Sequence, residues 1–325
     1  MNILLTGCAG FIGSHLAEKL LQLKHCVFGL DNLDPYYSES LKRANLQEIE
    51  KTAKNLNGTF NFEAIDIGNA EKIRTLFNGA SIDLVVHLAA LAGVRPSLER
   101  PCSYAKVNVE GTTNLLEEAR KQNIKKFVFA SSSSVYGNYK ETPFHENMVI
   151  DSMISHYATT KRSGELICKT YHNLYDMSIA CLRFFTVYGP RQRPDLAINK
   201  FTYKILQDVE ISIYGDGSKK RDFTYIDDII DGTVKAINWT AQTKNAAFDI
   251  FNLGESKTTD VNSLIAMIEE ATGKDAKRKY EPDVVGDVLQ TYADITKAKQ
   301  ILGYNPKTDI SEGVQKYVSW VKERL

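Results

Sequence analysis

The stretch NILLTGCAGFIG, residues 2–13, places a short apolar run directly before three glycines. The run has the composition of a buried β-strand, and the residues after it continue in a helical pattern. Glycines at such a junction permit a tight turn and close approach of a ligand to the backbone, and the first N–H groups of a helix bind phosphate. The spacing Gly-x2-Gly-x2-Gly at the first strand–helix junction indicates a dinucleotide-binding turn rather than an ordinary tight turn.

The first half of the chain repeats this order of strand and helix. Amphipathic stretches lie near residues 10–23, 41–53, 71–77 and 104–122, between apolar runs at residues 2–6, 26–31, 60–65, 84–88 and 126–131. A further strand is expected at residues 178–184. Strands that alternate with helices predict right-handed crossovers and a parallel sheet covered on both faces, which is a Rossmann-like, doubly wound α/β fold.

The pattern loosens after about Pro190, where short strands alternate with shorter helices. We expect residues 1–176 to form the dinucleotide-binding Rossmann domain, with segments at about 177–188 and 224–253 returning to it. Residues 189–325 are expected to form mainly a smaller α/β domain that binds the substrate and closes a cleft.

Composition excludes several classes of protein. The 325 residues are 43% hydrophobic, enough for a large core, and the 40 basic and 40 acidic residues balance. Such balance gives no field that would attract nucleic acid or an anionic membrane. We find no secretory signal and no membrane span, and the five scattered cysteines indicate neither disulfides nor a metal site. A cytoplasmic protein is expected.

An acidic residue ends the second strand. Asp31 can accept hydrogen bonds from both ribose hydroxyls of a bound adenosine and would repel a 2′-phosphate, which favours NAD over NADP as the cofactor. It can equally cap the turn that begins at Asn32. After the third strand, Asp66 and Ile67 can hold the adenine edge or form a plain turn.

Small residues end the fourth strand, where Leu88, Ala89 and Ala90 let a cofactor pass close to the backbone. His87 before them is expected to be a core histidine without chemistry, and Asn108 to bond the backbone near the sheet. The candidate cofactor-binding residues are Gly7, Gly10, Phe11, Ile12, Gly13, Asp31, Asn32, Asp66, Ile67, Leu88, Ala89, Ala90, Tyr157 and Lys161.

Hydroxyl groups gather at the end of the fifth strand, in residues 131–137. They can bond a substrate hydroxyl or satisfy their own turn. Tyr157 and Lys161 lie on one face of the next long helix, because residues four apart lie above one another. A lysine ammonium near a phenol favours the phenolate, so we expect Lys161 to lower the pKa of Tyr157 and make it a proton-transfer group.

Together these residues resemble the extended short-chain dehydrogenase/reductase family, specifically the nucleotide-sugar epimerases and dehydratases, over essentially the whole chain. The resemblance implies a tightly bound NAD and a catalytic group of Tyr157, Ser132 and Lys161. It implies that Tyr157 removes the proton of the sugar 4-hydroxyl, that Ser132 bonds the same oxygen, and that Lys161 bonds the nicotinamide ribose. Return of hydride to the opposite face of a rotated 4-keto sugar inverts C4.

The two residues after Ser132 indicate the branch of the family. Dehydratases of this family carry Asp-Glu there and decarboxylases usually a Glu, whereas this chain has Ser133 and Ser134, so it is similar to the epimerases. Residues 157–165 and 183–195 resemble the corresponding stretches of UDP-glucuronate 4-epimerases, whose product is UDP-galacturonate. Arginine forks suit both a diphosphate and a hexuronate carboxylate.

Arg193 is the candidate for that carboxylate, with Ser133, Ser134 and Thr186, although Arg191 and Arg193 can also be solvated loop charges. Arg221 matches the family arginine that binds the diphosphate, and Asp287 an acidic residue that binds the uridine ribose. Val284 stands where related galactose epimerases have an arginine, so phosphate binding is expected to use Arg221 and Asn199. The small Thr291 leaves room for a bulky sugar substituent.

Other functions stay open. A UDP-glucose or UDP-N-acetylglucosamine 4-epimerase is the first alternative, a decarboxylase or dehydratase the second, and a non-catalytic NAD-binding sensor the third. The resemblance also implies a homodimer, in which helices near residues 104–122 and 154–175 pair across a two-fold axis.

Overall fold

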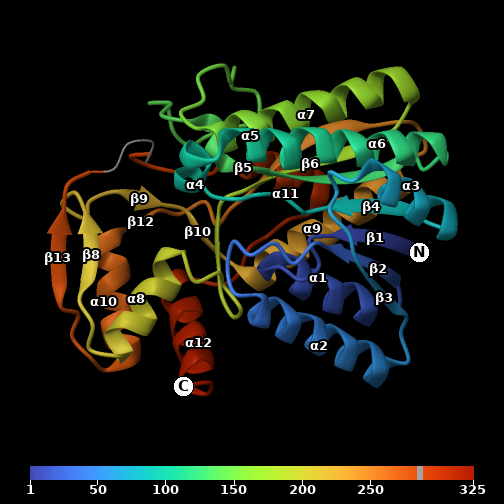
Figure 1. The fold of residues 1–325 in the computed structure, drawn as a ribbon. Helices are drawn as coiled ribbons and strands as arrows, with labels where there is room; N and C mark the ends of the chain where they lie inside the picture. The colour runs from blue at the N-terminus through green and yellow to red at the C-terminus, as the bar shows by residue number, and fades with distance from the viewer. Residues whose placement is uncertain (284–287) are drawn as a thin grey trace.

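The computed structural model describes residues 1–283 and 288–325. Its centre is a seven-stranded sheet, and every neighbouring pair of strands in it runs parallel (Figure 1). The order of the strands is β11 (Phe248–Leu253), β6 (Ser178–Phe184), β5 (Lys126–Ser132), β4 (Leu84–His87), β1 (Asn2–Thr6), β2 (Cys26–Asp31) and β3 (Phe60–Ala64). The predicted fold class, a Rossmann-like parallel sheet, is confirmed.

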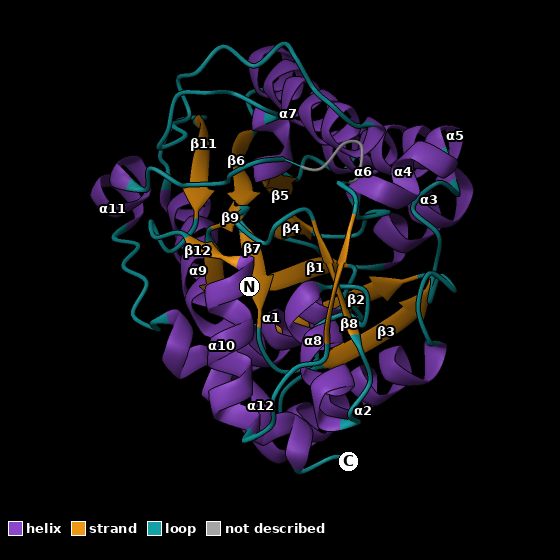
Figure 2. Cartoon of the chain, turned by 90° about the vertical axis from the view of Figure 1, so that its left-hand side faces the viewer, coloured by secondary structure: helices purple, strands orange, loops and turns teal. Residues whose placement is uncertain are grey.

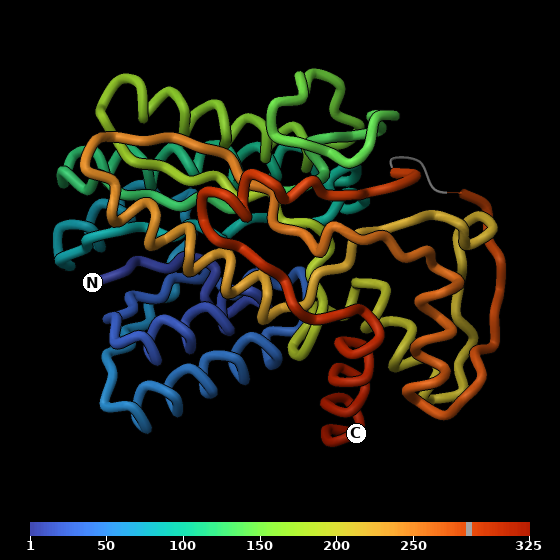
Figure 3. The backbone as a smooth tube through the Cα atoms, turned by 180° about the vertical axis from the view of Figure 1, so that it is seen from behind, coloured from blue at the N-terminus to red at the C-terminus, as the bar shows by residue number. Residues whose placement is uncertain are grey.

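Successive side chains of each strand point to opposite faces, and both faces are buried under helices (Figure 3). On one face, Leu4 and Val85 belong to a core cluster with α3 (Ala70–Gly79), α6 (Gly111–Lys121) and α7 (His156–Tyr175). On the other, Leu5 and Val86 belong to a cluster with α1 (Phe11–Gln22), α2 (Glu39–Leu56) and α9 (Ile226–Gln242). This alternation accounts for the apolar strands in the sequence.

Smaller elements connect the fourth strand to the helix α6. They are α4 (Val94–Glu99), α5 (Pro101–Ala105) and the π-helical turn η1 (Lys106–Glu110). A 3₁₀ turn, η2 (Ser133–Tyr136), comes after the fifth strand, so the chain turns away directly after Ser132. These segments therefore lie next to the carboxyl ends of the central strands, where parallel sheets bind ligands.

The remaining elements form a second layer beside the sheet, seen facing the viewer in Figure 2. Among the described residues it contains three helices and three pairs of short strands: α8 (Ala197–Leu206), α10 (Val261–Thr272), α12 (Ile310–Lys322), β8 (Ile211–Tyr214) with β13 (Arg278–Glu281), β9 (Lys220–Arg221) with β12 (Thr259–Asp260), and β7 (Thr186–Tyr188) with β10 (Phe223–Tyr225). The helix α11 (Thr296–Leu302) packs against α9 and β11. The chain leaves the large sheet after β6 and returns to it for α9 and β11.

Within residues 1–283 and 288–325, no helix combines the length and apolar character needed to cross a bilayer. The same described residues contain no cluster of histidine, cysteine and carboxylate side chains suited to a metal ion.

Candidate active site

A cavity of about 430 Å³ lies along the carboxyl edge of the sheet. Its walls come from the glycine turn, the ends of β2, β4 and β5, the start of α7 and the segment after β6. All the predicted cofactor-binding residues line it except Asp66, and so do Ser132, Ser133, Ser134, Thr186 and Arg193. The fold therefore brings together residues that the sequence separates by more than half its length.

The glycine turn is shaped by close backbone contacts. Gly7 has φ +73°, and a Cβ placed there would lie 2.8 Å from the backbone nitrogen of Ala89. A Cβ on Gly13 would lie 2.0 Å from the carbonyl oxygen of Gly7. Glycine is required at Gly7 because of its positive φ and the nearby backbone of Ala89, and at Gly13 because the helix α1 starts directly against the turn. The first residues of α1, Phe11, Ile12 and Gly13, line the cavity, and the first N–H groups of a helix can bind phosphate.

The carboxylate of Asp31 is buried at the edge of the cavity and accepts hydrogen bonds from the backbone N–H groups of Leu33 at 2.8 Å and Ala9 at 3.2 Å. Burial raises its pKa, and the two N–H groups and Lys42 counter that shift. Asp31 thus caps the following turn and also faces the cavity. Asp66 accepts from Gly68 and from the Asn32 side chain, in a turn outside the cavity lining.

The three predicted catalytic side chains meet at the other end of the cavity. Ser132 is the last residue of β5, while Tyr157 and Lys161 lie in the first turns of α7, which is capped by the Ser155 hydroxyl at 3.1 Å from the Ala158 N–H. The ammonium of Lys161 is buried and donates to the carbonyl of Ala130 at 2.7 Å.

The electrostatics of this end differ from the prediction. Burial raises the pKa of Tyr157, while hydrogen bonding to Ser132 and the charge of Arg193 lower it. Lys161 does not contribute to this shift, because its ammonium is 6.0 Å from the centre of the Tyr157 ring and is bound to the backbone of β5. Burial also lowers the pKa of Lys161 to about 8. The expectation that Lys161 brings this phenol towards neutrality is therefore wrong for this structure.

A family model described as GDP-mannose 4,6 dehydratase matches residues 4–317 of the chain. The chain belongs to this family of extended short-chain dehydrogenases/reductases. A UDP-glucuronate 4-epimerase of Thermodesulfobacterium geofontis is 44% identical to it over 323 residues, which is 99% of this chain and 96% of that protein.

Two solved structures of nucleotide-sugar epimerases share the fold. The UDP-glucuronic acid 4-epimerase of Bacillus cereus, in complex with UDP-glucuronic acid and NAD, is 39% identical with a TM-score of 0.91, over 100% of both chains. The UDP-glucose 4-epimerase of Thermotoga maritima, with UDP-glucose, is 34% identical with a TM-score of 0.88, over 100% of this chain and 99% of that one.

Two buried polar side chains connect neighbouring segments of this protein near the cavity. His87 bonds Thr6 at 2.8 Å through Nδ1 and Thr112 at 2.9 Å through Nε2, and burial lowers its pKa to about 3, so it is neutral. Asn108, in the π-helical turn, bonds both the N–H and the carbonyl of Leu91. The buried position predicted for His87 and the backbone contact predicted for Asn108 are confirmed.

The two arginines of the loop after β7 are not solvated. Arg193 forms two hydrogen bonds to Asp195, at 3.0 and 2.9 Å, and its side chain is 18% exposed. Arg191 pairs with Glu18 on α1 at 3.0 Å and is similarly covered. The interpretation of both as free loop charges is wrong, and only Arg193 of the two lines the large cavity.

The other predicted substrate residues fall in different places. Arg221 lines a smaller cavity with Ser133, Ser134, Thr186 and Thr291, and it donates to the carbonyl of Lys220 at 2.8 Å. Asn199 is buried, donates to the carbonyl of Gln192 at 3.0 Å and lines neither cavity. Asp287 and Val284 lie outside the described residues.

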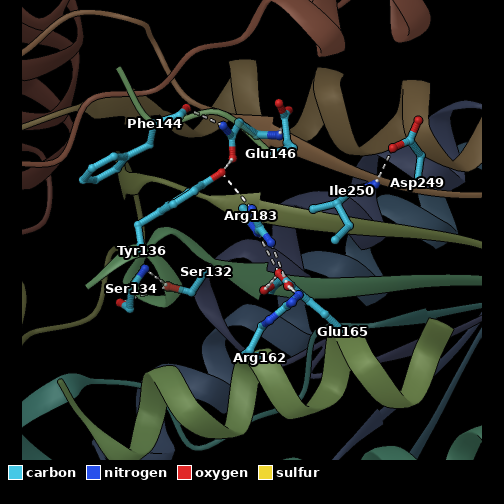
Figure 4. A network of polar contacts seen from close by, with 12 residues as sticks. Ser132, Ser134, Tyr136, Phe144, Glu146, Arg162, Glu165, Arg183, Asp249 and Ile250 are labelled. Carbon is cyan, nitrogen blue, oxygen red and sulfur yellow. Dashed lines mark hydrogen bonds and ion pairs between the residues drawn. The ribbon is translucent and has the colours of Figure 1, made fainter. Parts of the chain in front are cut away.

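Sequence reasoning assigned no role to a buried ion pair between Glu165 and Arg183, which joins α7 to β6 (Figure 4). Glu165, on α7, accepts from Arg183 of β6 at 2.8 and 2.9 Å and from Ser131 at 2.6 Å. Ser131 immediately precedes Ser132, so the pair holds the end of β5 against α7. The signal in the sequence is an arginine inside an otherwise apolar strand, SIACLRF, because an arginine is almost never fully buried unless it is paired.

The same network continues to the far side of the sheet. Arg183 donates to the hydroxyl of Tyr136 at 2.9 Å, and that hydroxyl donates to Asn252 of β11 at 2.7 Å. Asn252 in turn bonds the carbonyls of Phe144 and Asp294. The segment that contains Asp294 also carries Thr291, which lines the smaller cavity.

Proposed function

We propose that this protein catalyses the inversion of C4 of UDP-glucuronate to give UDP-galacturonate, with NAD as its cofactor. The observation that carries this proposal is the meeting of Ser132, Tyr157 and Lys161 at one end of a cavity whose other end is a dinucleotide-binding turn, with Arg193 in the cavity wall. The 39% identical Bacillus cereus epimerase that binds UDP-glucuronic acid and NAD supports it.

The residues present fit NAD. The backbone at Gly7 and Gly13 leaves no room for side chains and presents N–H groups to a pyrophosphate, and Asp31 faces the cavity for the adenosine ribose. When bound, NAD supplies the redox chemistry by accepting the hydride of the sugar C4 and returning it. The protein residues bind and orient the sugar and move the proton.

Tyr157 is the proposed proton-transfer group at the sugar 4-hydroxyl. It takes the proton when C4 is oxidised and returns it when C4 is reduced from the other face. Its raised pKa means that the phenol is protonated in this structure, so positive charge near it must stabilise the phenolate in the working site. The charge of Arg193 already acts in this direction. Ser132 holds the same sugar oxygen by a hydrogen bond.

The sugar substituent at C5 decides the substrate. Arg193 is proposed to bind the hexuronate carboxylate, with the hydroxyls of Ser133, Ser134 and Thr186 completing that side of the cavity. Ser133 and Ser134 carry no charge that would repel the carboxylate, and they offer no acid or base for removing a proton from C5. Their identity favours an epimerase over a dehydratase.

The proposal includes the binding of UDP by the part of the chain from residue 189 onwards. Arg221 is the proposed diphosphate ligand because it lines the smaller cavity beside Thr291, and Asp287 remains the proposed uridine ligand. Asn199 is a weaker candidate, since its amide is engaged with Gln192 away from both cavities. Residues 1–176, with the returning segments, are proposed to form the NAD-binding domain.

A homodimer in the cytoplasm completes the proposal. The helix α7 exposes Leu166 and Leu174, and a paired helix of a second copy would cover them. The five cysteines are free thiols, which fits a reducing compartment. Sedimentation at micromolar concentration tests the assembly, and a monomer would overturn it.

The decisive experiment is to incubate the purified protein, without added NAD, with UDP-glucuronate and follow C4 inversion by proton NMR, with UDP-glucose and UDP-N-acetylglucosamine in parallel samples. Inversion of UDP-glucuronate alone supports the cofactor, the reaction and the acid specificity together. Inversion of only the neutral sugars keeps the mechanism and rejects the role of Arg193. No inversion of any sugar, even after NAD is added, rejects the proposed function.

A further inference from the structure

The guanidinium of Arg193 is held by residues from two segments far apart in the sequence. Asp195 accepts from Nε at 3.0 Å and from Nη2 at 2.9 Å. Asp195 also accepts from the hydroxyl of Tyr36 at 3.2 Å, and the Arg193 guanidinium lies over the Tyr36 ring, 5.4 Å from its centre. The plane and the direction of the guanidinium are therefore set by two neighbours rather than one.

The guanidinium group has two edges that can bind a carboxylate with paired hydrogen bonds. Asp195 occupies the edge formed by Nε and Nη2. The remaining edge, formed by Nη1 and the second hydrogen of Nη2, has no hydrogen-bond partner within the described part of the chain, and Arg193 lines the cavity together with Thr186 and Tyr157. Arg193 can thus hold two carboxylates at once, one from the protein and one from a ligand.

Tyr36 is itself held firmly in the loop between β2 and α2. The side chains of Asp31, Asn32 and Asp34 each accept from the backbone N–H two residues later, which gives three successive turns that end at Tyr36. On its other side, a Cβ at Gly93 would lie 3.1 Å from the Tyr36 hydroxyl. The Tyr36 hydroxyl therefore lies close to Gly93 and reaches Asp195 in the loop after β7.

We propose that Asp195 and Tyr36 are positioning residues that aim the free edge of Arg193 at the carboxylate of the hexuronate and thereby determine the preference for an acidic sugar over a neutral one. The proposal rests on the function proposed above, and it assigns to Asp195 and Tyr36 a role that acts through Arg193. A neutral sugar has no group for that edge, so its binding does not depend on how Arg193 is aimed.

The charge of Asp195 has a second effect. Arg193 is mostly covered, and a covered cation without a partner is costly. Asp195 supplies that partner when no hexuronate is bound, so the cation keeps its place in the wall. The hexuronate then adds to an arginine that is already oriented, and less conformational freedom is lost on binding.

The test measures the dissociation constants of UDP-glucuronate and UDP-glucose by calorimetry in a Tyr157→Phe background, in which turnover is blocked. Asp195→Ala is expected to weaken UDP-glucuronate about tenfold, or about 1.4 kcal/mol, and UDP-glucose less than twofold. Tyr36→Phe, which keeps the ring and removes only the hydroxyl, is expected to weaken UDP-glucuronate two- to fourfold in the same direction.

The chain offers a matched control in the same loop. Glu18→Gln releases Arg191, which has a similar ion pair and similar cover but does not line the large cavity. This variant is expected to leave the ratio of the two dissociation constants unchanged. If Glu18→Gln changes this ratio as much as Asp195→Ala does, then general loosening of the loop, rather than the aim of Arg193, explains the loss of UDP-glucuronate binding.

Two further outcomes overturn the inference. Equal losses for both sugars in Asp195→Ala would give Asp195 a merely structural role, and tighter binding of UDP-glucuronate would make Asp195 a competitor of the substrate rather than its guide. Failure of the proposed function is seen separately, because the parent enzyme with Tyr157 intact would then not invert C4 of UDP-glucuronate at all.

Discussion

Replacing Glu165 by glutamine removes one negative charge from the centre of the fold. Its carboxylate has no exposed surface and accepts four hydrogen bonds, from Ser131, from Arg162 and twice from Arg183. Glutamine has nearly the same shape, but its amide NH2 group is a hydrogen-bond donor. It would replace one carboxylate oxygen, which accepts hydrogen bonds, and would face the donors of the neighbouring residues. Arg183, whose side chain is 1% exposed, would then be a buried cation without a counter-charge.

Breaking a buried ion pair by removing one partner costs about 3–5 kcal/mol, and total stabilities of folded domains are about 5–15 kcal/mol. We therefore expect Glu165→Gln to lose at least about 3 kcal/mol in urea unfolding followed by circular dichroism. The catalytic rate should fall as well, because Ser131, which Glu165 holds, is bonded directly to Ser132 in the chain.

The loss of stability on removing an ion pair depends mainly on how deeply the pair is buried. Glu39 and Arg43 form an ion pair on the exposed face of α2, with side chains 53% and 61% exposed. Glu39→Gln is the matched control, and it should cost less than about 1 kcal/mol because water solvates both partners. Similar losses in Glu39→Gln and Glu165→Gln, or a loss below about 1 kcal/mol in Glu165→Gln, would refute the reasoning.

The pH dependence gives an independent check. Burial raises the pKa of the Glu165 carboxyl, but the hydrogen bonds and the charge of Arg183 outweigh burial and hold this pKa below its usual value. The stabilisation from the ionised carboxylate is therefore present above the pKa of the unfolded chain and is lost as the pH falls through the lower, folded value. The advantage of the wild type over Glu165→Gln should shrink on acidification, and a constant difference across pH would contradict this.

Four further substitutions concern the cavity and a second buried carboxylate. Tyr157→Phe should nearly abolish turnover with the fold intact, and Ser132→Ala should cost on the order of 10²-fold in kcat; a wild-type rate in Tyr157→Phe would end the mechanism. Arg193→Ala should lower kcat/KM about 10- to 100-fold for UDP-glucuronate and much less for UDP-glucose, as expected for loss of a charged hydrogen bond; equal losses would reject its role. Burial and the charge of Asp228 raise the pKa of Glu255 to about 7; its contribution to stability is thus present below the unfolded pKa and lost as pH rises through about 7, so Glu255→Gln should gain on the wild type in urea unfolding between about pH 5 and pH 8.

The sheet can be predicted from the sequence because its strands are apolar on both faces and each precedes a helical pattern. The predicted bounds of residues 2–6, 26–31 and 178–184 match the observed strands, and those of the other three strands of the first half differ by one residue. The last strand of the sheet, β11, could not be predicted as its edge, since a strand that pairs with β6 across an intervening region carries no local mark of its neighbour. Local patterns determine what a segment becomes, whereas its partner depends on the whole chain.

The site shows the same division. Ser132, Tyr157 and Lys161 could be placed together because each stands at a defined point of a strand or helix, and such points converge in a parallel sheet. The contacts that their charged and polar groups make could not be predicted from the sequence. Lys161 binds the carbonyl of Ala130 rather than acting on the phenol of Tyr157, a choice that depends on the register between α7 and β5.

Arg193 shows why the charges matter for function. Its sequence context, a loop rich in arginine and proline, gives no reason to prefer a covered position over a solvated one. In the fold it is the cation whose charge lowers the pKa of Tyr157, and it also lines the cavity where the hexuronate carboxylate is proposed to lie. A carboxylate bound there would offset part of the charge that acts on the phenol. If the proposed function holds, acid recognition and proton transfer are coupled through one guanidinium, and a variant that disturbs the aim of Arg193 should change the pH profile of kcat as well as the choice of sugar.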